Sequence, residues 1–400
     1  MPSNILMPKI IETGAGARYR IANVLDSLGC RRPLIVTDAL MCELGNVDEL
    51  TDLLETHNIT CGIFSGTVPE PTESSVMSAL SYLRSGAPDG QDYDCIIALG
   101  GGSPIDSAKA ISVLGTHGGV IRDYKFPNQA ERPGLPVIAV PTTAGTGSES
   151  TRFTIITDDM SESEESVEEK MLCGGFGFMP LAAISDYELT LSVPARTTAD
   201  TGIDALTHAI ESYVSQKANP FSDQQALAAM RLIGPNLRSV YHQPDNRAAR
   251  ESMMLGATIA GSAFSNASVA LVHGMSRPIG AFFHVPHGLS NAMLLPTVTE
   301  FSVNQAYARY ADCARETGLA SGAEDDQSAV DRLVSELKEL NRELEVPSPK
   351  DYGIDEAAYF DALPTMADQA LTSGSPGNNP RVPSKDEIVT LYSEIWRRVA

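Results

Sequence analysis

Four side chains in two separate stretches of the sequence have the types and spacing of a metal-binding set. Asp204 and His208 lie four residues apart in TGIDALTHAIE, which places them one turn apart on the same face of a helix. His273 and His287 follow in stretches of small and apolar residues, where an unpaired imidazole would be costly. Three imidazoles and one carboxylate form a ligand set for a divalent transition metal, either Fe²⁺ or Zn²⁺.

The remaining histidines are weaker candidates for a metal site. His284 precedes His287 by three residues and could compete with it as a ligand. Because the two lie on a loop, they need not face the same way, and we expect His284 to line the substrate pocket instead. A lone histidine is more often a core or surface residue than a ligand, and this interpretation applies to His57, His117 and His242.

A glycine-rich turn, GGGSPIDSAKA, follows the apolar run at residues 96–99. Glycines such as Gly101 and Gly102 let the backbone approach a ligand closely, and the N-terminus of a helix binds phosphate. We expect Ser103 to cap that helix and Pro104 to occupy its first position. The alternative is a tight strand-to-helix turn without a ligand, since the stretch is neither GxGxxG nor a Walker A sequence.

Two further polar positions follow apolar runs. Asp38 ends the run at residues 33–37, where a carboxylate can accept hydrogen bonds from an adenosine ribose and would repel a 2′-phosphate. This position favours NAD over NADP, unless Asp38 only caps the helix that follows. The turn PTTAGTGSE follows the run at residues 137–140, and its hydroxyls could line a pyrophosphate and a nicotinamide. Here the alternative is an ordinary loop.

The elements that would position these residues change in type along the chain. Short apolar runs alternate with helical patterns in the first half, which indicates a parallel sheet built from βαβ units. The expected strands are residues 33–37, 60–64, 95–99, 137–140 and 182–185, and the expected helices are residues 19–28, 47–57, 73–84 and 103–114. After Asp186, helical periods dominate, for example at residues 222–233, 247–262, 327–344 and 385–399.

We therefore predict two domains, as expected for a chain too long for one core. Residues 1–188 would form an α/β dinucleotide-binding domain with a parallel sheet, and residues 189–400 an all-helical metal-binding domain. The acidic stretch at residues 158–165 is expected to be an exposed loop or a hairpin tip.

Composition excludes several classes of protein. The formal charge of −22 would repel nucleic acid and anionic lipids, and there is no run of 18 or more apolar residues to span a membrane. We find no secretory signal, and the six cysteines show no paired spacing. The sequence therefore predicts a cytoplasmic protein with reduced thiols.

Five motifs together resemble the iron-containing (group III) alcohol dehydrogenase family over nearly the whole chain. They are GGGSPIDSAKA, PTTAGTGSE, TGIDALTHAIE, LVHGMSRPIG and PHGLSNAMLLP. The resemblance implies that the metal ligands are the four residues named above, and that the protein is a homodimer or higher homo-oligomer. It further implies NAD contacts at Asp38, Gly101, Gly102, Ser103, Asp106, Thr142 and Thr143, with Lys170 near the ribose or the nicotinamide.

One residue departs from the family pattern. Many members have a histidine four residues after the third ligand, where this chain has Arg277. A guanidinium does not deprotonate at working pH, but it suits paired hydrogen bonds to a carboxylate. Our hypothesis is that Arg277 recognises the acidic end of an ω-hydroxy acid such as 4-hydroxybutyrate. The alternative is that Arg277 pairs with a nearby acid and only supports the pocket.

The resemblance predicts a metal-dependent enzyme that interconverts a primary alcohol and its aldehyde with NAD(H). The metal would act as a Lewis acid, and the nicotinamide would exchange the hydride. An alternative is a lyase similar to dehydroquinate synthase, which also uses NAD and a metal. That family has a ligand set closer to one Glu and two His, and it needs several basic groups for a phosphate, whereas this chain has an Asp with three His.

Overall fold

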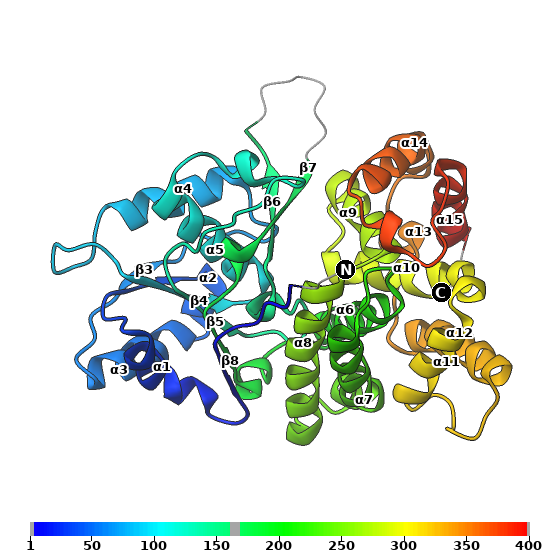
Figure 1. The fold of residues 1–400 in the computed structure, drawn as a ribbon, viewed down its shortest axis with the longest axis horizontal. Coiled ribbons are helices and arrows are strands. Elements are labelled where there is room, and N and C mark those ends of the chain that lie inside the picture. Colours follow the sequence, from blue (N-terminus) through cyan, green and yellow to red (C-terminus); the bar gives the residue numbers. More distant parts are fainter. Residues whose placement is uncertain (1–3, 161–168, 398–400) are drawn as a thin grey trace. The chain divides into compact units, whose positions relative to one another are not determined.

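The computed structural model describes residues 4–160 and 169–397, and the chain divides into two compact units. The α/β unit comprises Leu6–Thr143 and Gly147–Ser192, and the helical unit consists chiefly of Val193–Ala400 with Ala144–Thr146 (Figure 1).

The described residues of the α/β unit form a six-stranded sheet in the order β1-β8-β5-β4-β2-β3, in which every pairing is parallel. The strands are β1 (Ile10–Thr13), β2 (Pro33–Val36), β3 (Gly62–Phe64), β4 (Cys95–Gly100), β5 (Val137–Pro141) and β8 (Ala182–Ser185). The predicted parallel sheet is confirmed, and β1 is an edge strand that we did not predict.

Both faces of the sheet are covered by apolar side chains, because successive residues of a strand point to opposite faces. Leu34 and Ile96 belong to the core cluster that contains residues of α4 and α5, whereas Ile35 and Ile97 belong to the cluster on the side of α1 and α3. The helices and short 3₁₀ turns are η1 (Ala17–Arg20), α1 (Ile21–Leu28), α2 (Ala39–Glu43), α3 (Asn46–Thr56), α4 (Glu73–Arg84), α5 (Gly102–His117), η2 (Ile121–Tyr124), η3 (Ser148–Ser150), η4 (Phe176–Phe178) and η5 (Tyr187–Thr190).

An antiparallel hairpin extends from this unit. It pairs β6 (Phe153–Asp158) with β7 (Glu169–Gly174), and it was not among the predicted elements (Figure 1). Lys109 of α5 binds the hairpin where β6 begins. Its buried Nζ donates to the carbonyl oxygen of Phe153 at 2.8 Å and to Ser148 Oγ at 2.7 Å. Most of the acidic stretch predicted as a loop or hairpin tip, residues 161–165, lies outside the described residues.

In the helical unit, the described elements are all helices, which confirms the predicted change in fold class. They are α6 (Ala195–Val214), α7 (Pro220–His242), α8 (Arg247–Ala267), α9 (Leu271–Phe283), α10 (His287–Ser302), η6 (Val303–Gln305), α11 (Tyr307–Glu316), α12 (Asp326–Glu343), α13 (Pro349–Tyr352), α14 (Glu356–Thr372), η7 (Pro376–Asn378) and α15 (Lys385–Arg397). Helix α6 packs against α7, α8 and α10, and it is buried on all sides from Ile203 to Val214. A helix in that position can present polar side chains to the interior of the unit.

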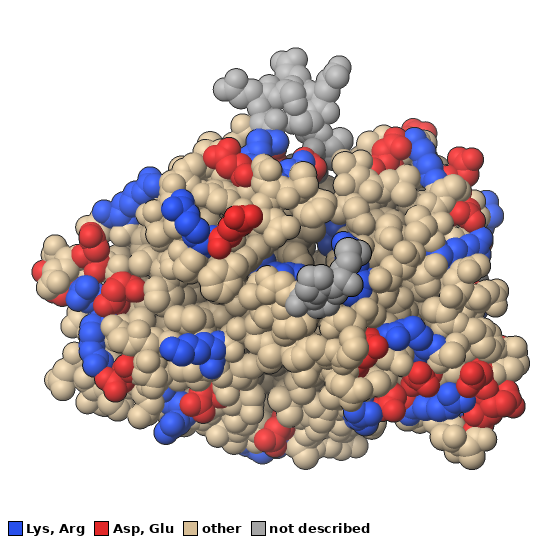
Figure 2. Space-filling view, viewed as in Figure 1, with Lys and Arg blue, Asp and Glu red and all other residues tan. Residues whose placement is uncertain are grey.

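Two further observations concern membranes and charge. Within the described residues, no single helix is long and apolar enough to cross a membrane; α8 and α9 reach that length and composition only together, with a bend of 104° between them. On the face drawn in Figure 2, acidic and basic side chains are interspersed, so this face carries no large area of one sign.

Candidate functional site

Helices α6, α9 and α10 bring the four predicted metal-binding side chains to one place. Oδ1 of Asp204, in α6, lies close to the Nε2 atom of each of the three histidines. The distances are 3.8 Å to His208, 3.4 Å to His273 and 3.9 Å to His287. Asp204, His208 and His273 are at most 3% exposed, and His287 retains 25% of its side-chain exposure. Residues that are 83 positions apart in the sequence therefore converge at this cluster.

The spacing of these donor atoms fits a bound cation. Metal–nitrogen bonds of about 2.0–2.1 Å in a tetrahedral site place the ligand atoms roughly 3.4 Å from one another. The separations from Asp204 Oδ1 lie at and slightly above that value. The rings of His208 and His273 stack with centroids 4.4 Å apart, so the two imidazoles are held side by side rather than swung away from the cluster.

The protonation states of Asp204 and His208 also suit metal binding, which requires an ionised carboxylate and neutral imidazoles. Burial by itself would raise the pKa of Asp204, but the neighbouring histidines outweigh it and hold that pKa below its usual range. Burial lowers the pKa of His208 to about 3, so this ring is neutral at physiological pH. For His273, burial lowers the pKa, and hydrogen bonds to Asp204 and Glu211 more than offset it.

Glu211 orients one of the histidines and was missed by the sequence analysis. Its buried carboxylate accepts the backbone N–H groups of Ala270 at 2.9 Å and Val272 at 2.6 Å, at the start of α9. It also lies 2.7 Å from Nδ1 of His273. A proton on Nδ1 that is donated to Glu211 leaves the Nε2 lone pair directed at the cluster. The available signal was spacing, because Glu211 follows His208 by three residues on the same helical face.

Asn291 is a second residue that the sequence analysis missed. It follows His287 by one helical turn in α10, it is fully buried, and its Nδ2 donates to Asp204 Oδ1 at 2.7 Å. The same Nδ2 lies 3.1 Å from Nε2 of His273 and 3.2 Å from Nε2 of His287. Asn291 therefore holds the carboxylate oxygen that faces all three rings.

Arg277 lies one turn after His273 in α9 and is buried. Its Nη1 donates to Ser375 Oγ at 2.9 Å, and its Nε has no hydrogen-bond partner among the described residues. No carboxylate in the described part of the chain lies within ion-pair distance of it. Burial lowers the pKa of Arg277 to about 10, although the more distant negative charge of Glu211 acts to raise it. His284 is exposed at the end of α9, in a left-handed conformation with φ of 52°.

The predicted cofactor residues gather at the carboxyl edge of the sheet in the α/β unit. Asp38 follows β2, the glycine-rich turn follows β4 and Thr142 follows β5, and these three strands are neighbours. Gly100 has φ of 146°, and a Cβ there would come within 2.6 Å of Pro104 and 3.4 Å of Asp38 Oδ2. The turn therefore requires glycine, and the carboxylate of Asp38 stands beside it.

The start of α5 differs from our expectation for Ser103. The helix begins at Gly102 with Gly101 as its N-cap, so Ser103 lies inside the first turn and is not the cap. Its Oγ instead accepts a hydrogen bond from the backbone N–H of Glu70 at 3.3 Å. Because glycine at the N-cap has no side chain to bond the first N–H groups, this helix end is left accessible to an anion.

The other predicted cofactor residues make contacts within the α/β unit. Oδ1 of Asp38 accepts from Met41 N at 3.0 Å, so this residue does cap the helix after it, as the alternative had it. Both carboxylate oxygens of Asp106 are engaged, by Ser148 Oγ and Ile155 N, and the Lys170 ammonium pairs with Glu70 at 2.5 Å. The backbone N–H of Thr142 donates to the carbonyl oxygen of Gly100 at 2.9 Å, and a Cβ on Gly101 would lie 3.6 Å from the Thr143 side chain.

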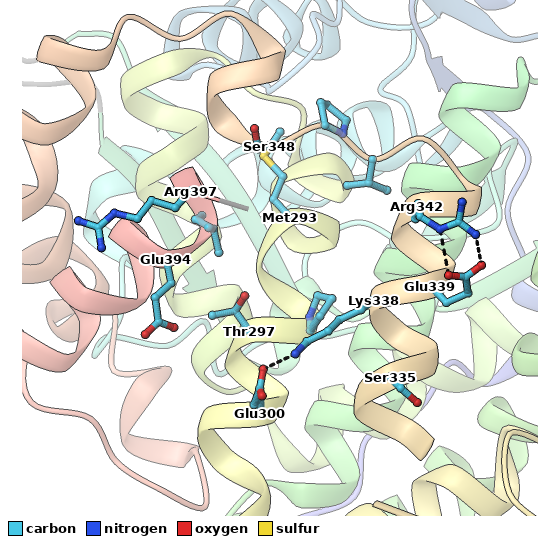
Figure 3. A pocket seen from close by; sticks show the side chains of 14 residues that line it. Met293, Thr297, Glu300, Ser335, Lys338, Glu339, Arg342, Ser348, Glu394 and Arg397 are labelled. Atoms are coloured by element: carbon cyan, nitrogen blue, oxygen red, sulfur yellow. Dashed lines mark hydrogen bonds and ion pairs between the residues drawn. The ribbon is translucent and has the colours of Figure 1, made fainter. Parts of the chain in front are cut away.

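A pocket of about 550 Å³ lies elsewhere in the helical unit, along α10, α12 and α15 (Figure 3). Two ion pairs occupy its wall, Lys338 with Glu300 at 2.6 Å and Arg342 with Glu339 at 3.0 Å. None of the sequence-predicted site residues is among the described residues that line it. We therefore place the candidate chemistry at the Asp204 cluster and not in this pocket.

Known proteins resemble the chain over almost its whole length. Residues 8–187 match the iron-containing alcohol dehydrogenase family, and residues 198–396 match the C-terminal domain of the Fe-containing alcohol dehydrogenase family. An NADPH-dependent butanol dehydrogenase from Clostridium saccharobutylicum is 34% identical, covering 98% of this chain and 97% of that protein.

Solved structures agree with this result. A 1,3-propanediol oxidoreductase has a TM-score of 0.91 at 32% identity, covering 99% of this chain and all of the other. A sulfoacetaldehyde reductase from Bifidobacterium kashiwanohense, in complex with NAD⁺, has a TM-score of 0.85 at 27% identity, covering 99% of each chain.

The contact between Glu211 and His273 yields a prediction about metal affinity. Glu211→Gln should weaken Zn²⁺ or Fe²⁺ binding by about 10- to 100-fold, because a neutral amide raises the basicity of the imidazole less than a carboxylate does. Competition with a chromophoric chelator measures the affinity, and the melting temperature reports folding separately. Ser212→Ala is the matched control, since Ser212 is the next buried residue and bonds only within α6. Equal affinities for Glu211→Gln and the control would contradict the assignment.

Proposed function

Since the chain belongs to the iron-containing alcohol dehydrogenase family, and so to the NAD(P)-linked oxidoreductases of alcohols and aldehydes, we propose that it interconverts a primary alcohol and its aldehyde at the Asp204 cluster. The proposal rests chiefly on one observation. A buried carboxylate oxygen faces three imidazole nitrogens at 3.4–3.9 Å, and these distances suit a shared cation. Asp204, His208, His273 and His287 would hold that cation.

In this proposal the bound metal supplies Lewis-acid polarisation of the alcohol or aldehyde oxygen, and the nicotinamide supplies or accepts the hydride. The protein's part is to position both. Glu211 and Asn291 hold His273 and Asp204 in place, and burial of the cluster limits the water that could compete for the cation. At the sheet edge, the open start of α5 would accept the cofactor's phosphates.

We propose NAD(H) as the preferred cofactor. Support comes from the carboxylate of Asp38, whose Oδ2 lies at the glycine turn and would repel a 2′-phosphate. The carboxylate of Glu70, whose backbone N–H bonds Ser103, is already paired with Lys170. The relatives differ in their cofactor, because one is an NADPH-dependent enzyme and another was solved with NAD⁺. The charge at Asp38 is therefore the basis of this choice.

We propose that the substrate carries an anionic end group that binds Arg277, as an ω-hydroxy acid such as 4-hydroxybutyrate would. A buried guanidinium without a nearby carboxylate is costly, and an anionic substrate would supply the missing charge. Among the relatives, the sulfoacetaldehyde reductase acts on an aldehyde that bears a sulfonate. Others are named for butanol and propanediol, so the acidic substrate rests on Arg277 and not on the family.

Three finer points belong to the same proposal. Iron is the proposed metal because the matched family is iron-containing, while Zn²⁺ suits the same donor atoms. A homodimer is proposed from the family resemblance. A cytoplasmic location is proposed from the six cysteines, which are all free thiols.

The function is tested by assaying alcohol-dependent reduction of NAD⁺ with metal analysis on the same sample. Chelation should abolish turnover, and Fe²⁺ or Zn²⁺ should restore it, because the cluster provides no other Lewis acid. Alcohol oxidation that persists at full rate in metal-free protein would exclude this mechanism.

Cofactor preference is tested with Asp38→Asn, which keeps a side chain able to cap α2 but removes the charge. The ratio of kcat/KM for NAD⁺ to that for NADP⁺ should fall by about tenfold or more, since one repulsive charge is worth on the order of 1–2 kcal/mol. Glu43→Gln removes an exposed charge from the same helix and is the control. An unchanged ratio in Asp38→Asn would refute the role of this carboxylate.

Substrate recognition is tested with Arg277→Gln. The kcat/KM for 4-hydroxybutyrate should fall by roughly 100-fold, as expected when one partner of a buried charge pair is removed. The kcat/KM for 1-butanol should change only a few-fold, and Arg277→Lys should restore part of the loss. Metal content is measured in each variant to separate misfolding from lost recognition. Equal losses on the two alcohols would show that Arg277 only supports the pocket.

A further inference from the structure

Two buried cysteines, far apart in the sequence, meet at the amino ends of β2 and β4. Cys30 follows Gly29, which ends α1 in a left-handed conformation, and the N–H of Cys30 donates to Leu25 O at 2.9 Å. Cys95 is the first residue of β4 and is paired with Pro33 of β2. The two Sγ atoms and a carboxylate oxygen of Asp94 all lie within 4.8 Å of one another.

Asp94 is already committed to other contacts. Its carboxylate accepts the backbone N–H of Arg31 at 3.0 Å and that of Arg32 at 2.8 Å. The guanidinium of Arg32 lies a further 3.5 Å from Oδ2. A cation bound to Cys30 and Cys95 would need the Asp94 carboxylate as its oxygen ligand, and would therefore compete with the Arg32 guanidinium for it. The cluster therefore suits chemistry between the two sulfurs better than it suits a metal.

We propose that Cys30 and Cys95 form a reversible redox pair, which closes to an intrachain disulfide when the protein meets a hydroperoxide. The Cys30 thiolate attacks the peroxide, whose O–O bond breaks, leaving a sulfenic acid and hydroxide. The Cys95 sulfur then displaces the hydroxyl from Cys30 as the S–S bond forms. In total, two thiols and one hydrogen peroxide give one disulfide and two waters.

The surroundings of the pair assign the first step to Cys30. A hydrogen bond with the Cys95 thiol lowers the pKa of Cys30 despite burial, while the pKa of Cys95 is raised. Cys30 is 2% exposed between Gly29 and Arg31, which are themselves exposed, whereas Cys95 is fully buried. A bond of about 2 Å requires the sulfurs to approach further. The connection between α1 and β2 is the segment that can supply this movement.

The position of the pair predicts what closure does. Cys95 and Gly100 lie at opposite ends of β4, roughly 16 Å apart at 3.3 Å per residue. Closure would join residue 30 to residue 95 without contacting the glycine turn. We expect the melting temperature to rise, because the bond constrains the unfolded chain, and turnover to change less than twofold.

The test uses the purified, metal-loaded enzyme and hydrogen peroxide as the probe. After oxidation and alkylation, peptide mapping should recover a linked pair containing Cys30 and Cys95, with a loss of about two mass units that dithiothreitol reverses. Cys30→Ser and Cys95→Ala should each abolish the linked pair. Cys42→Ser is the matched control, since it removes an exposed thiol of the same unit and should leave the linkage intact.

Two results would overturn the proposal. One is oxidation confined to Cys42, with Cys30 and Cys95 recovered as unlinked thiols. The other is a second Zn²⁺ per chain in native mass spectrometry that disappears in Cys30→Ser, which would make the cluster a metal site. If Cys95→Ala does not fold, the loss of the linked pair is tested with Cys30→Ser alone, because Cys30 is less deeply buried than Cys95.

Discussion

The organisation of the helical unit depends on keeping one ionised carboxylate and three imidazoles in a protein interior. Burying Asp204 alone would be unfavourable, and burying the rings of His208 and His273 without partners would also be unfavourable. The proposed shared cation would resolve both costs, since each donor lone pair would then have a partner. Helix α6 supplies Asp204 and His208 from one face, while His273 and His287 come from α9 and α10, so these three helices must pack together.

The cluster is held in place by a second set of contacts that also joins the helices. Glu211, from α6, caps the start of α9 through two backbone N–H groups and contacts His273 with the same carboxylate. Asn291, from α10, reaches Asp204 in α6. The same hydrogen bonds therefore join the helices and orient the candidate ligands, so a change at the start of α9 would also change the orientation of His273. In the α/β unit, the corresponding constraint is the turn at Gly100, where no side chain fits.

Much of the fold could be predicted because the strands are short, apolar and separated by helical patterns. A parallel strand buried on both faces appears in sequence as a continuous apolar run, as at residues 95–99. The missed elements lack this signature. Strand β1 is an edge strand with alternating burial, and the β6–β7 hairpin includes polar residues such as Thr154 and Lys170. The expected cap at Ser103 was wrong because the cap is Gly101, two residues earlier, and the helix begins at Gly102.

The sequence by itself predicted the two fold classes and the four candidate ligands that the structure brings together, because helical periodicity and residue chemistry are local properties. Only the tertiary structure showed that Glu211 and Asn291 contact those side chains, that no carboxylate of the described residues lies within ion-pair distance of Arg277, and that Cys30 meets Cys95. Each of these facts depends on which elements pack together. Such contacts join residues from 18 to 98 positions apart, and no spacing rule along one chain specifies them.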